Sequence, residues 1–172
     1  MALALEPSAG MAPISPATPQ TFAVEEDRAR LTPAALIALR ALARTWKLTG
    51  AEAAALVGVS TTTWDRAKAG TWQQTLSQDQ MMRVSAMIGL FKGLHLLFAD
   101  DMADRWVRLR NSGALLANLT PVEAMIERGI PGMIEIRHYV DALRGGSVTG
   151  GPSGHPARAA PRRPACRDRA AA

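Results

Sequence analysis

Residues 50–70 decide the fold, and they read GAEAAALVGVSTTTWDRAKAG. The stretch holds two short helical patterns separated by Gly58, and Ser60 is placed to cap the second of them. Glycine at such a turn tolerates the positive φ that a tight connection between helices requires. Ala54 is small enough for two helices to cross closely beside it, and Val59 supplies an apolar side chain just after the turn. The pattern predicts a helix-turn-helix over residues 50–70.

The second helix of this motif is expected to bury one face and expose the other. Trp64 and Ala67 fall on the inward stripe. Hydroxyls and backbone N–H groups at a helix N-terminus suit phosphate, and an arginine can read a guanine edge. The candidate DNA-contacting residues are therefore Ser60, Thr61, Thr62, Asp65, Arg66 and Lys68. Further candidates for phosphate contacts are Arg40, Arg44 and Lys47. The alternative is an ordinary solvated face, because two short helices joined at a glycine occur in many helical proteins.

The sequence from residue 31 to 146 is punctuated as a series of helices. Thr32 and Pro33 predict the N-cap and the first residue of a helix that precedes the motif. Ser77 and Gln80 form a capping box that predicts the start of a long helix after the motif. The sequence shows no convincing alternation of apolar and polar residues, which is the pattern typical of β-strands. The predicted fold class is therefore all-α, with a helix-turn-helix domain followed by a small helical module.

Helix signals continue into the last part of this region. One helix is expected to begin at Asp100 or Asp101, and a capping box at residues 120–123 starts a short helix that Gly129 ends. A final helix is expected from Pro131 or Gly132 to Arg144. Its buried stripe is predicted to consist of Met133, Ile136, Val140 and Leu143.

Composition and charge define four regions. Residues 1–30 and 147–172 are rich in proline and small residues and are expected to be disordered ends, the second one also rich in arginine and glycine. The helix-turn-helix domain is expected over residues 31–99 and the helical module over residues 100–146. The net charge is +5, and residues 31–99 alone, with seven bases and three acids, carry +4. This local excess favours an acidic partner such as nucleic acid.

Several classes of protein are disfavoured by what the 172 residues contain. A single cysteine, Cys166, rules out an intramolecular disulfide framework and a multi-cysteine zinc site. No apolar run approaches about 18 residues, and the first basic residue is Arg28, so we expect a cytoplasmic protein without a membrane span. The three histidines are far apart in the sequence and have no reactive partner at a suitable spacing, so the sequence predicts no enzyme, cofactor or metal site.

The sequence after residue 100 carries a more specific pattern. Trp106 is followed by LTPVEAMIERG at residues 119–129 and by LRGG at residues 143–146. This arrangement resembles the toxin-binding domain of the Xre/MbcA/ParS antitoxin family, in which a short proline-containing helix ends at a glycine and a final amphipathic helix follows. The preceding helix-turn-helix resembles the Xre-type half of the same family. The resemblance covers roughly residues 31–146, with both halves in the family's order.

The resemblance implies an antitoxin of a type II toxin–antitoxin system. Such proteins pair with a RES-domain toxin that consumes NAD⁺, cover the entrance of its active site, and bind operator DNA to repress their own operon. On this sequence the toxin-facing elements would be residues 120–129 and 132–144. The implied partners are the cognate RES-domain toxin, operator DNA, and a second copy of the chain, with higher toxin–antitoxin hetero-oligomers. The chain departs from the family pattern in its long tail after Gly146.

The polar face of the final helix, together with one arginine of the short helix before it, supplies the candidates for toxin contact, because arginine is enriched at binding hot spots. These candidates are Arg128, Arg137, His138, Asp141 and Arg144. Two other functions stay open at this point. One is a stand-alone helix-turn-helix transcriptional regulator whose C-terminal part only dimerises, and the other is an adaptor that has lost DNA binding.

Overall fold

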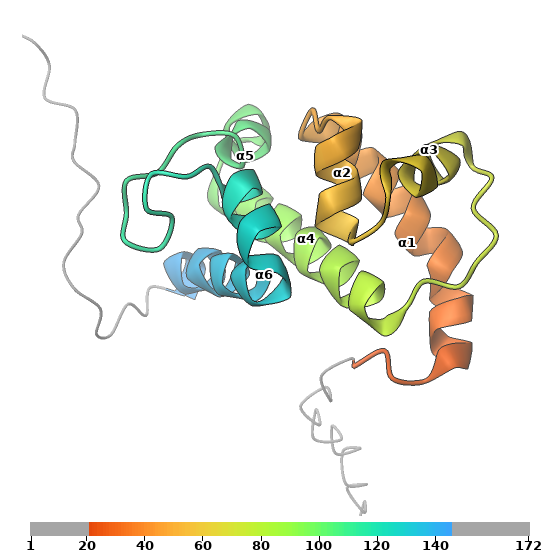
Figure 1. Ribbon diagram of the computed structural model, residues 1–172. Helices are drawn as coiled ribbons and strands as arrows, with labels where there is room; N and C mark the ends of the chain where they lie inside the picture. The colour runs from red at the N-terminus through yellow and green to blue at the C-terminus, as the bar shows by residue number, and fades with distance from the viewer. Residues whose placement is uncertain (1–20, 146–172) are drawn as a thin grey trace, which may run out of the picture.

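The computed structural model describes residues 21–145, and this part of the chain contains six helices and no strand (Figure 1). The all-α prediction is therefore confirmed for these residues. The helices are α1 (Glu25–Thr45), α2 (Gly50–Val57), α3 (Thr61–Ala69), α4 (Gln78–Leu97), α5 (Asp100–Trp106) and α6 (Pro121–Gly145). Most of the predicted disordered ends lies outside the described residues.

Helix α4 is the central element of the fold. Helices α1, α2 and α3 lie toward one side of it, and α5 and α6 lie toward the other (Figure 1). The helices share one buried apolar core. Four of its side chains are nearly inaccessible to solvent: Leu39 of α1, Leu56 of α2, Leu90 of α4 and Ile136 of α6. The ranges 31–99 and 100–146, which composition and motifs separate, share this core.

Local caps position the helices where the sequence predicts them. Gly58 ends α2 with a φ of 77°, and the Ser60 hydroxyl accepts a hydrogen bond from the Thr63 N–H at 3.1 Å. Ser77 and Gln80 form the predicted capping box at the start of α4. The predicted box at residues 120–123 is also present. Each cap satisfies backbone N–H groups that a helix start leaves without an intrahelical partner.

The start of α1 differs from the prediction. The helix begins at Glu25, so residues 25–30 are helical rather than disordered, and Pro33 lies inside the helix instead of at its first position. Thr32 is not an N-cap: its hydroxyl donates to the Arg28 carbonyl at 2.7 Å and accepts from the Leu76 N–H at 3.0 Å. This long-range contact and the acidic residues of the first turn, which suit the positive end of the helix dipole, favour the longer helix.

Helix α6 is two helical segments that meet at Gly129. This glycine has φ 63° and ψ −147°, a conformation essentially restricted to glycine. The predicted end of the short helix at this residue is thus seen as a kink. Met133, Ile136 and Val140 are buried as predicted, but Leu143 retains 41% exposure, so its assignment to the buried stripe was wrong. Leu143 lies in the last turn of α6, two residues before its end at Gly145.

Glycines of α4 allow α6 to approach closely. A Cβ placed on Gly93 would lie 2.9 Å from the Val140 side chain, and one on Gly89 would lie 2.5 Å from the Arg137 guanidinium. Because the residue numbers rise together in both helices, α4 and the second segment of α6 run in the same direction.

Candidate nucleic-acid and partner interfaces

Helices α2 and α3, with a turn at Gly58 between them, form where the sequence predicts a helix-turn-helix over residues 50–70. The Gly58 and Val59 N–H groups both donate to the Ala54 carbonyl, at 2.9 and 3.0 Å, which closes the turn between α2 and α3. Trp64 and Ala67 of α3 are buried, with exposures of 4% and 2%. Burial of this stripe fixes the rotation of α3 and leaves its opposite face in solvent.

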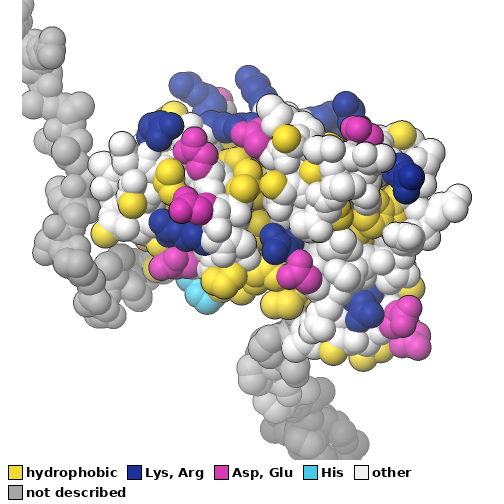
Figure 2. All heavy atoms as spheres, viewed as in Figure 1, with side chains coloured by type: hydrophobic (Ala, Val, Ile, Leu, Met, Phe, Trp, Pro, Cys, Tyr) yellow, Lys and Arg dark blue, Asp and Glu magenta, His cyan; other side chains and the backbone are white. Residues whose placement is uncertain are grey.

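All six predicted DNA-contacting residues are exposed on or beside α3: Ser60, Thr61, Thr62, Asp65, Arg66 and Lys68. The Ser60 hydroxyl is engaged in the cap. Within residues 21–145, the side chains of Asp65, Arg66 and Lys68 have no hydrogen-bond or ion-pair partner. Their polar groups are therefore available to another molecule. Lys and Arg side chains are visible along the edge formed by α2 and α3 (Figure 2).

A basic hollow lies beside this face, between the end of α1 and α3. Its volume is about 370 Å³, and its lining includes Arg40, Arg44, Lys47 and Lys68 but no acidic residue. The Arg40 guanidinium donates to the Ala67 carbonyl at 3.3 Å, which ties α1 to α3. Four cations around one hollow attract an anionic group. The candidates for phosphate contacts, Arg40 and Arg44 of α1 and Lys47 just after it, are thereby brought together with Lys68 of α3.

The connection from α3 to α4 adds polar groups that sequence reasoning missed. A second hollow of about 420 Å³ is lined by Thr63 and Arg66 of α3 together with Thr71, Trp72, Gln73 and Gln74. The Trp72 indole donates to the Gln74 carbonyl at 2.5 Å, which constrains the loop. The two adjacent glutamines were a signal in the sequence, because glutamine side chains can pair with base edges.

Four of the five predicted toxin-contacting residues, all except His138, are engaged by groups of residues 21–145. Arg128 donates to the Leu115 carbonyl at 2.6 Å and lies 3.7 Å from the Glu135 carboxylate. Arg137 lies over Gly89 of α4 and pairs with Asp141 at 3.7 Å. The side chains of Arg137 and Asp141 are only partly exposed, because both also meet α4, at Gly89 and Gly93.

The outward face of the second segment of α6 carries different residues. His138 and Arg144 are exposed as predicted, although Arg144 also pairs with Asp141 at 3.1 Å. Between them, Tyr139 and Leu143 expose 39% and 41% of their surface, one helical turn apart. Sequence reasoning placed Leu143 in the core and did not single out Tyr139 as a contact. Neighbouring exposed apolar groups of this size are typical of the anchors found in protein interfaces.

Two arginines connect the helix-turn-helix to the C-terminal half. Arg108 donates to both carboxylate oxygens of Glu52, at 2.5 and 2.8 Å, and to the Trp46 and Lys47 carbonyls at 3.0 and 2.7 Å. Its hydrogen bond is the main reason that the pKa of Glu52 is lowered to about 2. Sequence reasoning missed this pair, which is separated by 56 residues.

Arg83 makes the second connection. Its side chain donates to Asp79 at 2.7 Å and to the Leu56 carbonyl at 3.4 Å, and it lies against Gly58 and near Gly129. One α4 side chain therefore contacts the turn of the helix-turn-helix and lies beside the kink of α6.

Residues 21–145 include no group of three or more His, Cys, Asp or Glu residues arranged to hold a metal ion. No helix among them has the length and hydropathy to cross a bilayer. Comparison of the chain with family models, with curated proteins and with solved structures gave no match.

Proposed function

We propose that this protein is the antitoxin of a type II toxin–antitoxin system. In this proposal α3 reads operator DNA, and the outward face of α6 covers the active site of a RES-domain toxin that consumes NAD⁺. One observation carries the proposal: two exposed surfaces belong to the same packed body. The first is the face of α3, whose exposed polar side chains have no partner within residues 21–145. The second is on α6, which is kinked at Gly129 and exposes Tyr139 and Leu143.

Several features of α3 support DNA binding. The helix is capped and rotationally fixed by its buried Trp64, so Arg66 projects from a defined position. The basic hollow next to it suits a backbone phosphate, and phosphate contacts orient a recognition helix in the groove. The side chain that reads a base edge in this proposal is Arg66, and Lys68 contributes to backbone contacts.

The support for partner binding comes from α6. Covering an active site requires shape and buried area rather than a reactive group. Tyr139 and Leu143 supply apolar surface, and His138 and Arg144 supply a polar rim, which is the usual composition of an interface. We therefore move the proposed toxin contacts from Arg128, Arg137 and Asp141 to His138, Tyr139, Leu143 and Arg144.

Co-expression with the protein encoded beside this chain, which the proposal expects to carry a RES domain, tests the proposal. Growth arrest caused by that protein alone should be relieved by this chain, and the absence of relief would overturn the antitoxin assignment. Deleting α6 is a poor test, because α6 contributes Met125 and Ile136 to the shared core and its loss would unfold α4. A surface substitution on α6 is the appropriate variant.

The shared core also favours a second candidate. If α6 serves only to complete the core around α4 and to dimerise, the protein is a stand-alone helix-turn-helix regulator. Such a regulator would bind DNA but would relieve no toxin.

A further inference from the structure

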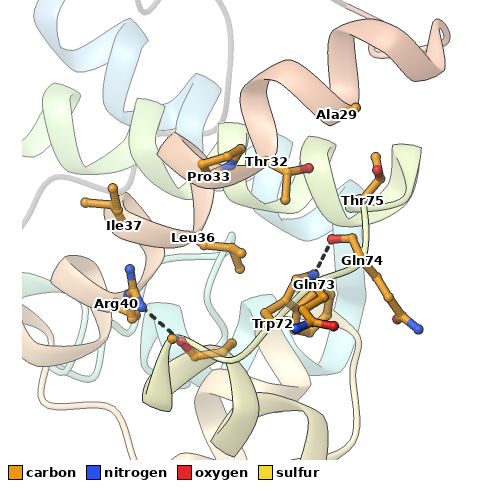
Figure 3. Close-up of a pocket in the computed structure, with 12 residues that line it drawn as sticks. Ala29, Thr32, Pro33, Leu36, Ile37, Arg40, Trp72, Gln73, Gln74 and Thr75 are labelled. Carbon is orange, nitrogen blue, oxygen red and sulfur yellow. Dashed lines mark hydrogen bonds between the residues drawn. The ribbon is translucent and has the colours of Figure 1, made fainter.

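A groove separates α1 from the loop that leads into α4. Its volume is about 310 Å³, and Figure 3 shows residues of α1 on one side and residues 72–75 on the other. Leu36 and Ile37 contribute apolar surface from α1, and Ile37 is 61% exposed. Trp72 contributes an aromatic ring from the loop. An aromatic ring and an exposed branched side chain along one groove are features that bind proline-rich segments.

Hydrogen-bond donors line the same groove. The side-chain amides of Gln73 and Gln74 make no hydrogen bond within residues 21–145, and the Arg40 guanidinium has donors beyond the one given to the Ala67 carbonyl. A polyproline II backbone makes no internal hydrogen bonds, so its carbonyl groups need donors from outside. The groove therefore combines an apolar contact surface with donors for such a backbone.

The chain itself contains a matching segment. Residues 13–19 read PISPATP, in which prolines recur at every third position as Pro13, Pro16 and Pro19. Polyproline II has three residues per turn, so these three rings would share one face of the helix. The remaining proline of the first twenty residues, Pro7, lies six residues before Pro13 and outside this segment.

The position of Thr21 places this segment within reach of the groove. The Thr21 carbonyl accepts a hydrogen bond from the Gln78 side chain at 2.9 Å. Gln78 lies three residues after Thr75, which lines the groove, and Pro19 lies two residues before Thr21. At about 3.1 Å per residue a seven-residue polyproline II segment extends about 20 Å, which is sufficient to cross such a groove.

We propose that residues 13–19 bind in the groove between α1 and the loop at residues 72–75, in the same molecule, with the three proline rings packed against Trp72 and Ile37. The groove shares Arg40, Gln73 and Gln74 with the hollows beside α3. The proposal and its test do not require the proposed antitoxin function.

A spin label on residue 15 tests the proposal in the full-length chain. Ser15→Cys is made in a Cys166→Ser background, so that the label has one attachment site. Ser15 falls between the prolines of the period, which places the label on a face away from the three rings. The measurement is the loss of amide signal intensity in a ¹⁵N-labelled sample, with attention to Ala29, Ile37 and Gln73.

Two variants provide the comparison. The triple substitution Pro13→Ala, Pro16→Ala and Pro19→Ala removes the periodic rings, and Pro7→Ala is the matched control outside residues 13–19. We expect strong signal loss at the groove residues in the parent and in the Pro7→Ala variant, and recovery of these signals in the triple variant. Equal signal loss with and without the three prolines, or loss centred away from the groove, would overturn the proposal.

A mixed sample shows whether the segment that binds the groove comes from the same molecule or from a second copy of the chain. Spin-labelled chain without ¹⁵N is combined with ¹⁵N-labelled chain without the spin label. We expect no signal loss at the groove in this sample, because the segment binds within its own molecule. Signal loss there would assign the groove to a second copy of the chain and would contradict the intramolecular site.

Discussion

The Arg108 guanidinium holds the Glu52 carboxylate with two hydrogen bonds, at 2.5 and 2.8 Å. Glu52 also accepts from the Thr49 N–H at 2.8 Å as part of the capping box that starts α2. The same guanidinium binds two carbonyls at the end of α1. The first turn of α2 is therefore fixed to the segment after α5, and a partner that binds the C-terminal half meets a body continuous with α2 and α3.

This pair predicts a specific dependence of stability on pH. The pKa of Glu52 falls from 4.5 to about 2 on folding, first because of the Arg108 hydrogen bond. A lowered pKa in the folded state contributes stability that is complete above about pH 4.5 and is lost as the pH falls toward 2. At pH 7, Glu52→Gln should lower the free energy of unfolding by about 2–3 kcal/mol, as measured by urea denaturation.

The matched control is Glu127→Gln, at an exposed position with no ion-pair partner within residues 21–145. This variant should have the parent's free energy of unfolding at pH 7 and also as the pH approaches 2. The difference between the parent and Glu52→Gln should shrink as the pH approaches 2. A difference that stays constant from pH 7 to pH 2 would mean that ionisation of Glu52 contributes nothing.

The close approach of α4 and α6 predicts opposite outcomes for two similar substitutions. Gly93→Ala would place a methyl group 2.9 Å from the branched Val140 side chain, which cannot move aside. It should destabilise the fold by about 1–3 kcal/mol. Gly89→Ala would meet only the flexible end of Arg137, so the better helix propensity of alanine should leave stability unchanged or raise it by up to about 1 kcal/mol. Thermal denaturation of both variants checks this, and an equal loss in both would contradict the packing.

The kink of α6 predicts a penalty for any side chain at its centre. Gly129→Ala forces a Cβ into a region of φ and ψ that L-residues avoid, at a cost of about 1–3 kcal/mol. Gly50→Ala is the control, because a Cβ there meets Trp64 at an ordinary distance of 3.7 Å. Chemical denaturation should show a lower midpoint only for Gly129→Ala. A midpoint unchanged by this substitution would indicate that α6 does not require the kink.

The α3 face predicts two kinds of loss in DNA binding. Arg66→Ala should reduce discrimination between the operator and a scrambled sequence by about 1–3 kcal/mol. Lys68→Ala should weaken binding to both sequences and lower the salt slope of log K by about 0.9. Arg105→Ala removes an equal charge from α5 and should change neither quantity. Titration by fluorescence anisotropy at several salt concentrations measures all three, and an Arg66 variant with full discrimination would show that α3 is wrongly placed on the DNA.

Local signals account for the part of the fold that the sequence predicts correctly. Ser60, Ser77 and Thr120 cap helices through contacts with residues three positions away, so their role is visible in a short window. Gly58 and Gly129 mark turns for the same reason.

The incorrect predictions depend on contacts between distant segments. Thr32 has the appearance of an N-cap, but its hydroxyl bonds the Leu76 N–H, 44 residues away. A helical wheel separates the apolar and polar faces of α6, but it does not show that Arg137 on the polar face also contacts α4 at Gly89. Arg108 has no local partner that distinguishes it from any exposed arginine.

Inhibition of the toxin is the central claim, and the rate of NAD⁺ consumption by the purified RES-domain partner measures it directly. Leu143→Glu places a charge on the outward face of the last turns of α6, and Leu109→Glu places one in the segment after α5, at a position with an identical exposure of 41%. We predict that the parent chain and Leu109→Glu abolish the activity at a saturating ratio, and that Leu143→Glu leaves the toxin active. Full activity in the presence of the saturating parent chain, or full inhibition by Leu143→Glu, would contradict the account.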